Sequence, residues 1–170
     1  MMLAGNRNFR YVKLSNYLKS ENCFKIARPD VGINDLSDTV EFFLQNVHKG
    51  CSHLIFQIGS YDVNNSCTEA VKNRVEVLFS KMTAREISLI LSGPIPQYSA
   101  NSESFSRAHN INQWMSKFTE DNDIKYIDNF TNFRNQRHFF DRSGYSLNSA
   151  GQKLLEISIS ETLALADHEA

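Results

Sequence analysis

Short apolar runs alternate with segments of helical pattern along the chain. Two of these runs, H-L-I-F-Q-I and I-S-L-I-L, are almost continuously apolar. Runs of this kind are typical of strands that are buried on both faces of a parallel sheet. The runs that predict strands are Met1–Ala4, Cys23–Ala27, His53–Ile58, Ile87–Leu91 and Ile124–Ile127.

The segments between these runs carry apolar residues at helical spacing. One of them places Val71, Val75 and Leu78 on a single helical face, so this face is expected to pack against the sheet. The predicted helices are Asn8–Ser20, Asp35–Val47, Cys67–Met82, Ser106–Thr119 and Asn148–Ala164.

Strands that alternate with helices predict an α/β fold, a three-layer doubly wound sheet of five parallel strands. The chain has 170 residues, which suits one domain. We expect this domain to span residues 1–165 and the polar end, residues 166–170, to form a frayed tail.

In such a sheet the functional crevice lies beyond the carboxyl ends of the strands. Two long polar stretches, Ile95–Ser104 and Thr131–Ser146, are expected to be loops that overhang this crevice. The shorter segments expected there are Gly5–Arg7, Pro29–Gly32, Gly59–Asp62, Gly93–Pro94 and Asp128–Phe133.

Charge and composition narrow the range of functions. The hydrophobic fraction is 41% and the charged fraction 22%, values that are ordinary for a globular protein. The net charge is -1, which removes the general electrostatic argument for tight nucleic-acid binding. A local basic cluster is nevertheless present at Arg134, Arg137, His138 and Arg142.

The sequence offers no sign of a membrane span, a secretory leader or a metal site. Its apolar runs are shorter than the ~20 residues of a spanning helix, and M-M-L-A-G-N-R lacks the pattern of a signal peptide. Cys23, Cys51 and Cys67 are too scattered for a disulfide framework or a zinc site. We therefore expect an intracellular, cytoplasmic protein without a metal or cofactor.

Several motifs carry a family resemblance. Between Leu91 and Gly151 the chain reads L-S-G-P-I-P-Q-Y, S-F-S-R-A-H-N-I-N-Q-W-M, Y-I-D-N-F and F-F-D-R-S-G-Y-S-L-N-S-A-G, and upstream it reads I-G-S-Y-D and A-G-N-R-N-F-R-Y-V. This order resembles the SGNH (GDSL-type) hydrolases. More narrowly, it resembles the esterase-like domain in the first reading frame of LINE retrotransposons of fish and other vertebrates. The resemblance implies the flavodoxin-like SGNH-hydrolase fold.

The resemblance also implies where catalysis would take place, and the sequence departs from the family there. Arg7 stands at the position of the nucleophilic serine, and Tyr61 replaces the asparagine of the oxyanion hole. Ser143 and Ser146 replace the aspartate and histidine of the last motif, so that Gly32 alone matches among the functional residues.

A guanidinium stays protonated and has no lone pair with which to attack a carbonyl. We therefore expect no catalytic residue in this chain, because the nucleophile, base, base-orienting carboxylate and oxyanion donor are all replaced. The residues expected around the former active-site crevice are Gly5, Asn6, Arg7, Gly32, Gly59, Tyr61, Asp62, Ser143 and Ser146.

The leading hypothesis is an inactive SGNH-fold domain of retroelement origin that binds a protein partner or a small anion at Arg7. In a plainer alternative Arg7 pairs with Asp62 or points into solvent, and Tyr61 plugs the crevice. A second hypothesis is an active esterase with a noncanonical set, Ser146, His138 and Asp141. A third is a nucleic-acid-associated retroelement protein that acts through its basic loop, Arg134–Arg142.

Overall fold

Five parallel strands form one sheet in the order β2-β1-β3-β4-β5, which is the flavodoxin-like order. The structure is a computed structural model that describes residues 1–13, 24–28, 31–46 and 51–168. The strands are β1 (Met2–Gly5), β2 (Phe24–Ala27), β3 (His53–Gln57), β4 (Ser88–Ser92) and β5 (Lys125–Ile127). The predicted strands and the parallel α/β class are confirmed, with strand ends shifted by one or two residues.

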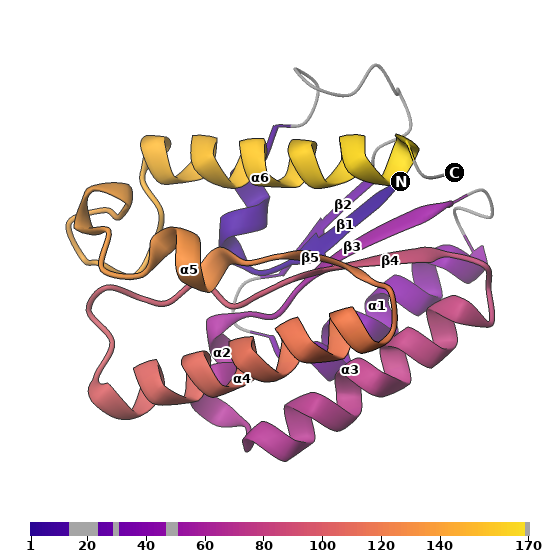
Figure 1. Cartoon of the computed structure of the whole chain (residues 1–170), viewed down its shortest axis with the longest axis horizontal. Helices are drawn as coiled ribbons and strands as arrows, with labels where there is room; N and C mark the ends of the chain where they lie inside the picture. The colour runs from indigo at the N-terminus through magenta and orange to yellow at the C-terminus, as the bar shows by residue number, and fades with distance from the viewer. Residues whose placement is uncertain (14–23, 29–30, 47–50, 169–170) are drawn as a thin grey trace.

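Helices cover both faces of the sheet and complete the three layers (Figure 1). α1, α3 and α4 lie on one face, and α6 lies on the other. The helices are η1 (Arg7–Tyr11), α1 (Ile33–Asn46), α2 (Ser60–Asn65), α3 (Thr68–Thr83), α4 (Ser102–Asp121), α5 (Asn129–Phe133), η3 (Arg137–Phe139) and α6 (Ser149–His168). None of the helices in the described part of the chain is long and apolar enough to cross a membrane.

The core is divided by the sheet because successive strand residues face opposite sides. In β3, Leu54 and Phe56 belong to the core beneath α1, α3 and α4, whereas Ile55 belongs to the core beneath α6. β1 lies between β2 and β3, and its Met2 and Leu3 are almost fully buried. This central position carries the segment after β1 to the middle of the carboxyl edge of the sheet.

The prediction of a helix over Asn8–Ser20 is wrong for the first residues of this range. A short 3-10 helix, η1, runs from Arg7 to Tyr11, and Val12 is extended. Lys25 Nζ donates hydrogen bonds to the carbonyls of Arg10 and Val12, which ties the end of η1 to β2. Residues 14–20 of the predicted helix lie outside the described residues, as does Cys23.

Other helix boundaries also differ from the sequence prediction. α4 begins at Ser102 instead of Ser106, because the Asn101 side chain accepts a hydrogen bond of 2.8 Å from Ser104 N and caps the helix. The helices α2, α5 and η3 were not predicted, and each is too short to show an amphipathic period. α6 continues beyond the predicted domain end at 165 to His168.

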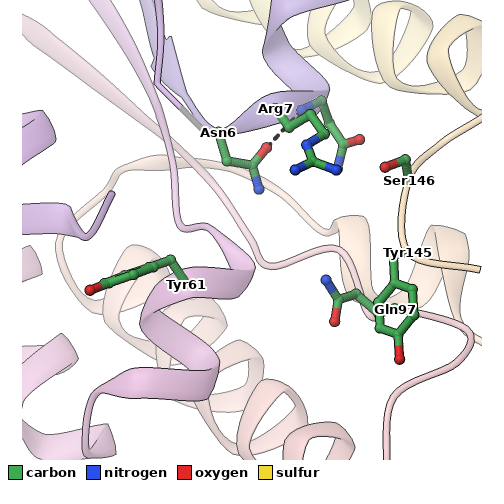
Figure 2. A pocket seen from close by; sticks show the side chains of 7 residues that line it. Asn6, Arg7, Tyr61, Gln97, Tyr145 and Ser146 are labelled. Carbon is green, nitrogen blue, oxygen red and sulfur yellow. Dashed lines mark hydrogen bonds between the residues drawn. The ribbon is translucent and has the colours of Figure 1, made fainter. Parts of the chain in front are cut away.

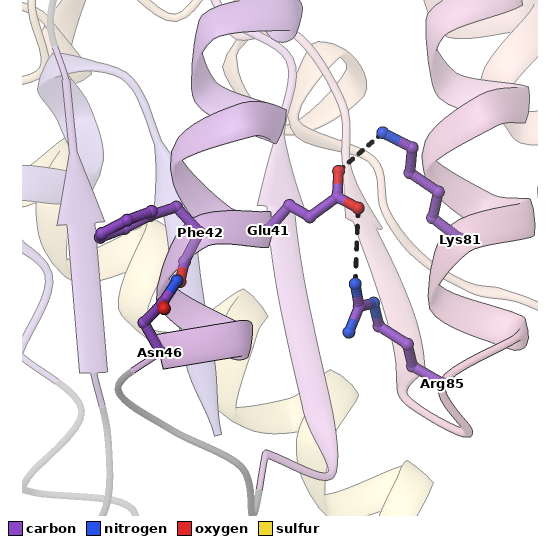
Figure 3. A network of polar contacts seen from close by, with 5 residues as sticks. All are labelled: Glu41, Phe42, Asn46, Lys81 and Arg85. Atoms are coloured by element: carbon purple, nitrogen blue, oxygen red, sulfur yellow. Dashed lines mark hydrogen bonds and ion pairs between the residues drawn. The ribbon is translucent and has the colours of Figure 1, made fainter.

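An ion-pair cluster joins α1 to α3 (Figure 3). Glu41 binds Lys81 at 2.7 Å and Arg85 at 3.4 Å. These partners, chiefly the hydrogen bond from Lys81, lower the pKa of the Glu41 carboxyl. The three side chains are partly exposed, so solvent screens the pairing.

Candidate functional site

A crevice with a volume of about 230 Å³ lies beyond the carboxyl ends of the central strands. Figure 2 shows Asn6 and Arg7 on one side of it and Gln97, Tyr145 and Ser146 on the other. The lining residues are Asn6, Arg7, Asn8, Tyr61, Gln97, Tyr145 and Ser146. The structure thus brings together four residues that the sequence placed at the crevice, from segments far apart in the chain.

The turn after β1 places Arg7 at the first position of η1. Asn6 Oδ1 accepts a hydrogen bond of 3.0 Å from Asn8 N and so caps η1. A Cβ on Gly5 would lie 2.7 Å from the Phe9 ring, so the glycine allows Phe9 to fold back over the strand end. Asn8 is 7% exposed, and its Oδ1 accepts a hydrogen bond from Leu147 N. The turn is therefore held firmly while the Arg7 side chain remains exposed to the crevice.

Tyr61 forms one edge of the crevice and does not fill it. The Tyr61 ring is packed against Gly32, because two ring carbons lie 3.5 Å from the place of a Cβ on that glycine. The Tyr61 residue is 43% exposed, and Figure 2 shows its ring directed away from Arg7 and Ser146. The expectation that Tyr61 plugs the crevice is therefore wrong, because the ring packs beside Gly32 at the edge of the crevice. Gly59 lies at the same edge, in contact range of Asn6.

Asp62 supports the backbone around the crevice and does not line it. Its Oδ1 accepts a hydrogen bond of 2.8 Å from Ile33 N, the first residue of α1, and lies 3.9 Å from Arg74 Nη1. The residue is 2% exposed, and this burial raises the pKa of its carboxyl. Asp62 therefore ties the start of α2 to the start of α1, with Arg74 of α3 as its neighbouring cation.

Ser143 belongs to a tight turn beside the crevice. Its hydroxyl donates a hydrogen bond of 2.6 Å to Asp141 Oδ1, and Gly144 N donates to the same oxygen at 3.0 Å. These hydrogen bonds, the one from Ser143 first, lower the pKa of Asp141. Ser143 was expected around the crevice, but it is not among the residues that line it.

The noncanonical catalytic set is not joined by hydrogen bonds among the described residues. Asp141 binds Ser143 and Gly144, as just described. The His138 ring lies against the Phe139 ring, with centroids 4.0 Å apart. Ser146 lines the crevice, and none of the other residues that line it is a histidine.

A buried polar cluster lies at the carboxyl ends of β3 and β4, and the sequence analysis missed it. Asn129 Nδ2 donates hydrogen bonds to Ser92 Oγ and to the Gly93 carbonyl, at 2.7 and 2.8 Å. Gln57 is 1% exposed, and neither of its amide atoms has a hydrogen-bond partner within the described chain. The only sequence signal for this site was a single glutamine within the nearly continuous apolar run of β3.

The crevice carries a positive charge. Arg7 is the cation among its lining residues, and the other lining side chains carry amides and hydroxyls. Guanidinium, amide and hydroxyl groups all donate hydrogen bonds to anions. Within the described ranges, no group of three or more His, Cys, Asp or Glu side chains is arranged to hold a metal ion.

Comparisons with known proteins identify the fold. No protein-family model matches the chain, and no curated protein matches its sequence. Among solved structures, a GDSL-like lipase from Bacteroides thetaiotaomicron has a TM-score of 0.81 at 12% identity, covering 97% of this chain and 87% of the lipase. A G-D-S-L family lipolytic protein from Veillonella parvula has a TM-score of 0.82 at 11% identity, with coverages of 94% and 95%.

A third solved structure is the esterase domain of the ORF1 protein from the zebrafish ZfL2-1 retrotransposon. Its identity to this chain is 22%, its TM-score is 0.55, and the match covers 96% of this chain and 98% of that domain. Together with the strand order β2-β1-β3-β4-β5, these likenesses show that the chain has the SGNH-hydrolase fold.

Proposed function

We propose that this chain is a catalytically inactive SGNH-fold domain that binds a small anion in the former active-site crevice. The observation that carries the proposal is that Arg7, a permanent cation, lines the crevice. By the family resemblance, Arg7 stands at the position of the nucleophile. The proposal includes an origin in a retroelement coding region, which is supported by the likeness to the zebrafish ORF1 esterase domain. We also propose that the protein acts inside the cell.

Inactivity is supported by the groups around Arg7. A serine hydroxyl needs an adjacent base to become a nucleophile, and none of the residues that line the crevice is a histidine. A hydroxyl and a histidine do meet elsewhere, where Ser52 Oγ and His53 Nδ1 are 2.9 Å apart. That pair lies at the start of β3, the opposite edge of the sheet, and no carboxylate is bonded to His53 within the described residues.

Anion binding is supported by charge, donors and size. One guanidinium with surrounding neutral donors matches a singly or doubly charged ligand, such as a carboxylate or a phosphate. The volume of about 230 Å³ is below the 300–1,000 Å³ that is usual for drug-sized ligands, so a small head group fits best.

The two other hypotheses receive less support from the contacts. The carboxylate of the noncanonical esterase set, Asp141, is occupied by Ser143 and Gly144. In the basic loop, the Arg137 guanidinium donates hydrogen bonds to the carbonyls of Phe140, Asp141 and Arg142, so it serves the loop itself.

The proposal is tested by isothermal titration of the protein with inorganic phosphate and with acetate. We expect saturable binding by the wild-type protein and its loss in Arg7→Gln. Arg10→Gln is the matched control, because Arg10 is an exposed arginine of the same short helix that does not line the crevice. Absence of binding, or equal binding by Arg7→Gln, would refute the anion site.

A further inference from the structure

A second cavity adjoins the crevice. Its volume is about 360 Å³, and Gln97 lines both spaces. Figure 2 shows Gln97 beside Tyr145, on the side of the crevice opposite Asn6. The residues that line the second cavity are Pro96, Gln97, Tyr98, Ala100, Ser102, Phe105, Ser106 and Asn135. A larger space therefore lies next to the crevice, on the far side from Asn6 and next to Gln97.

Two aromatic rings, those of Tyr98 and Phe105, line the second cavity. Tyr98 is 49% exposed and its ring packs at 6.4 Å from the Phe140 ring, which leaves much of its surface open. Phe105 is half-buried, and its ring lies 5.3 Å from the Phe130 ring. Partly exposed rings held in place by buried rings favour a flat apolar or aromatic ligand, which packs against them without a large entropic cost.

An arginine lies over each of these rings. Arg134 Cζ is 5.8 Å from the centroid of Phe105, and Arg137 Cζ is 5.4 Å from that of Tyr98. Arg137 is held in place because its guanidinium donates to three backbone carbonyls. Two guanidinium groups therefore lie close to the rings of the cavity, although neither arginine is among its lining residues. Positive charge near the rings complements an electron-rich ring attached to an anion.

We propose that the ligand of the crevice is an anion that carries a planar ring, with its charged group at Arg7 and its ring in the cavity of Tyr98 and Phe105. This inference rests on the proposed function and specifies its ligand class. The amides of Gln97 and Asn135 stand at the cavity wall and match a ring with hydrogen-bonding edges, so an aromatic phosphate monoester such as a nucleotide has the required chemistry.

Three phosphates of graded shape test the inference by isothermal titration: inorganic phosphate, n-butyl phosphate and phenyl phosphate. We expect phenyl phosphate to bind roughly five- to tenfold more tightly than n-butyl phosphate, which has a matched phosphate group and a flexible chain. Tyr98→Leu should abolish this preference while inorganic phosphate still binds. Tyr11→Leu is the matched control, since Tyr11 is 57% exposed and lines neither space.

The outcomes separate the two proposals. If inorganic phosphate binds through Arg7 but phenyl and n-butyl phosphate bind equally well, the planar-ring inference is overturned and the anion site stands. If none of the three phosphates binds, the anion site itself fails, and the inference fails with it. Equal binding of phenyl phosphate by the wild-type protein and by Arg7→Gln would show that the ring and the charge are not recognised together. This result would also overturn the inference.

Discussion

The Ser99 hydroxyl donates a hydrogen bond of 2.7 Å to the Ser143 carbonyl and so fastens the loop after β4 to the turn before α6. Ser99 N also donates to the Gly144 carbonyl, at 3.3 Å. The turn leads directly into Tyr145 and Ser146, which line the crevice. These contacts hold the turn in place beside the crevice.

Gly144 is the residue on which this turn depends most. Its φ is +75°, and a Cβ there would collide with the Ser99 side chain. We expect Gly144→Ala to reduce the free energy of unfolding by about 1–3 kcal/mol, as measured by urea denaturation. The double variant Ser99→Ala/Gly144→Ala should recover part of that loss because the colliding hydroxyl is gone. Strict additivity of the two substitutions would contradict the proposed contact.

Asp62 predicts an unusual pH dependence of stability. Burial raises the pKa of its carboxyl above 3.8 in the folded state. The favourable contribution of this group is therefore fully present below the unfolded-state pKa and is lost as the pH rises through the folded-state pKa. We expect the stability of wild type relative to Asp62→Asn to fall between pH 3.5 and pH 7, measured by urea denaturation at each pH.

The opposite trend for Asp62 would mean that its ionised form is favoured in the folded protein. The neighbouring Arg74, 3.9 Å away, is the group that would cause this. Arg74→Gln then serves as the control, because it removes the cation and leaves the hydrogen bond from Ile33 N in place. With the cation removed, the expected fall in stability with rising pH should become steeper.

Glu41 predicts the reverse dependence. Lys81 and Arg85 lower the pKa of its carboxyl below 4.5, so its contribution is present above that pH and disappears as the pH falls through the folded-state pKa. We expect Glu41→Gln to cost about 0.5–1 kcal/mol at neutral pH and less in high salt, in thermal or urea unfolding. Glu69→Gln, which breaks a more exposed pair with Lys72, should cost less.

The buried amide of Gln57 predicts a stabilising substitution. A polar group without a partner costs about 1–3 kcal/mol when it is buried, and methionine has a similar length without the amide. We expect Gln57→Met to raise the free energy of unfolding by about 1 kcal/mol in urea denaturation. A clear loss of stability would show that the amide has a strong partner in solution.

The sequence predicted the layers well because they depend on local pattern. Apolar runs such as that of Leu54 and Phe56 are read directly as buried strands, and the helical spacing of Val71 and Val75 is equally direct. η1 was mistaken for a long helix because apolar spacing does not reveal that Lys25 binds the carbonyls at its end. Short helices such as α2 were missed because their formation depends on tertiary contacts, which apolar spacing does not reveal.

Of the residues that line the crevice, only those within the family motifs were predicted. Asn6, Arg7, Tyr61 and Ser146 line it as expected, since each follows a strand or precedes α6 in a recognisable motif. Gln97 and Tyr145 were missed because their positions depend on how two long loops pack together. Asp62 and Ser143 lie in the expected segments, but hydrogen bonds with Ile33 and Asp141 turn them toward structural roles.

The central claim is the proposal that the crevice does not catalyse ester hydrolysis. A measurement of ester turnover tests this claim most directly. The measurement is the steady-state hydrolysis of p-nitrophenyl acetate by the wild-type protein and by Ser146→Ala. We predict that both proteins leave the rate at that of buffer, because no base stands beside the crevice hydroxyl. Measurable turnover by the wild-type protein that is lost in Ser146→Ala would contradict the account.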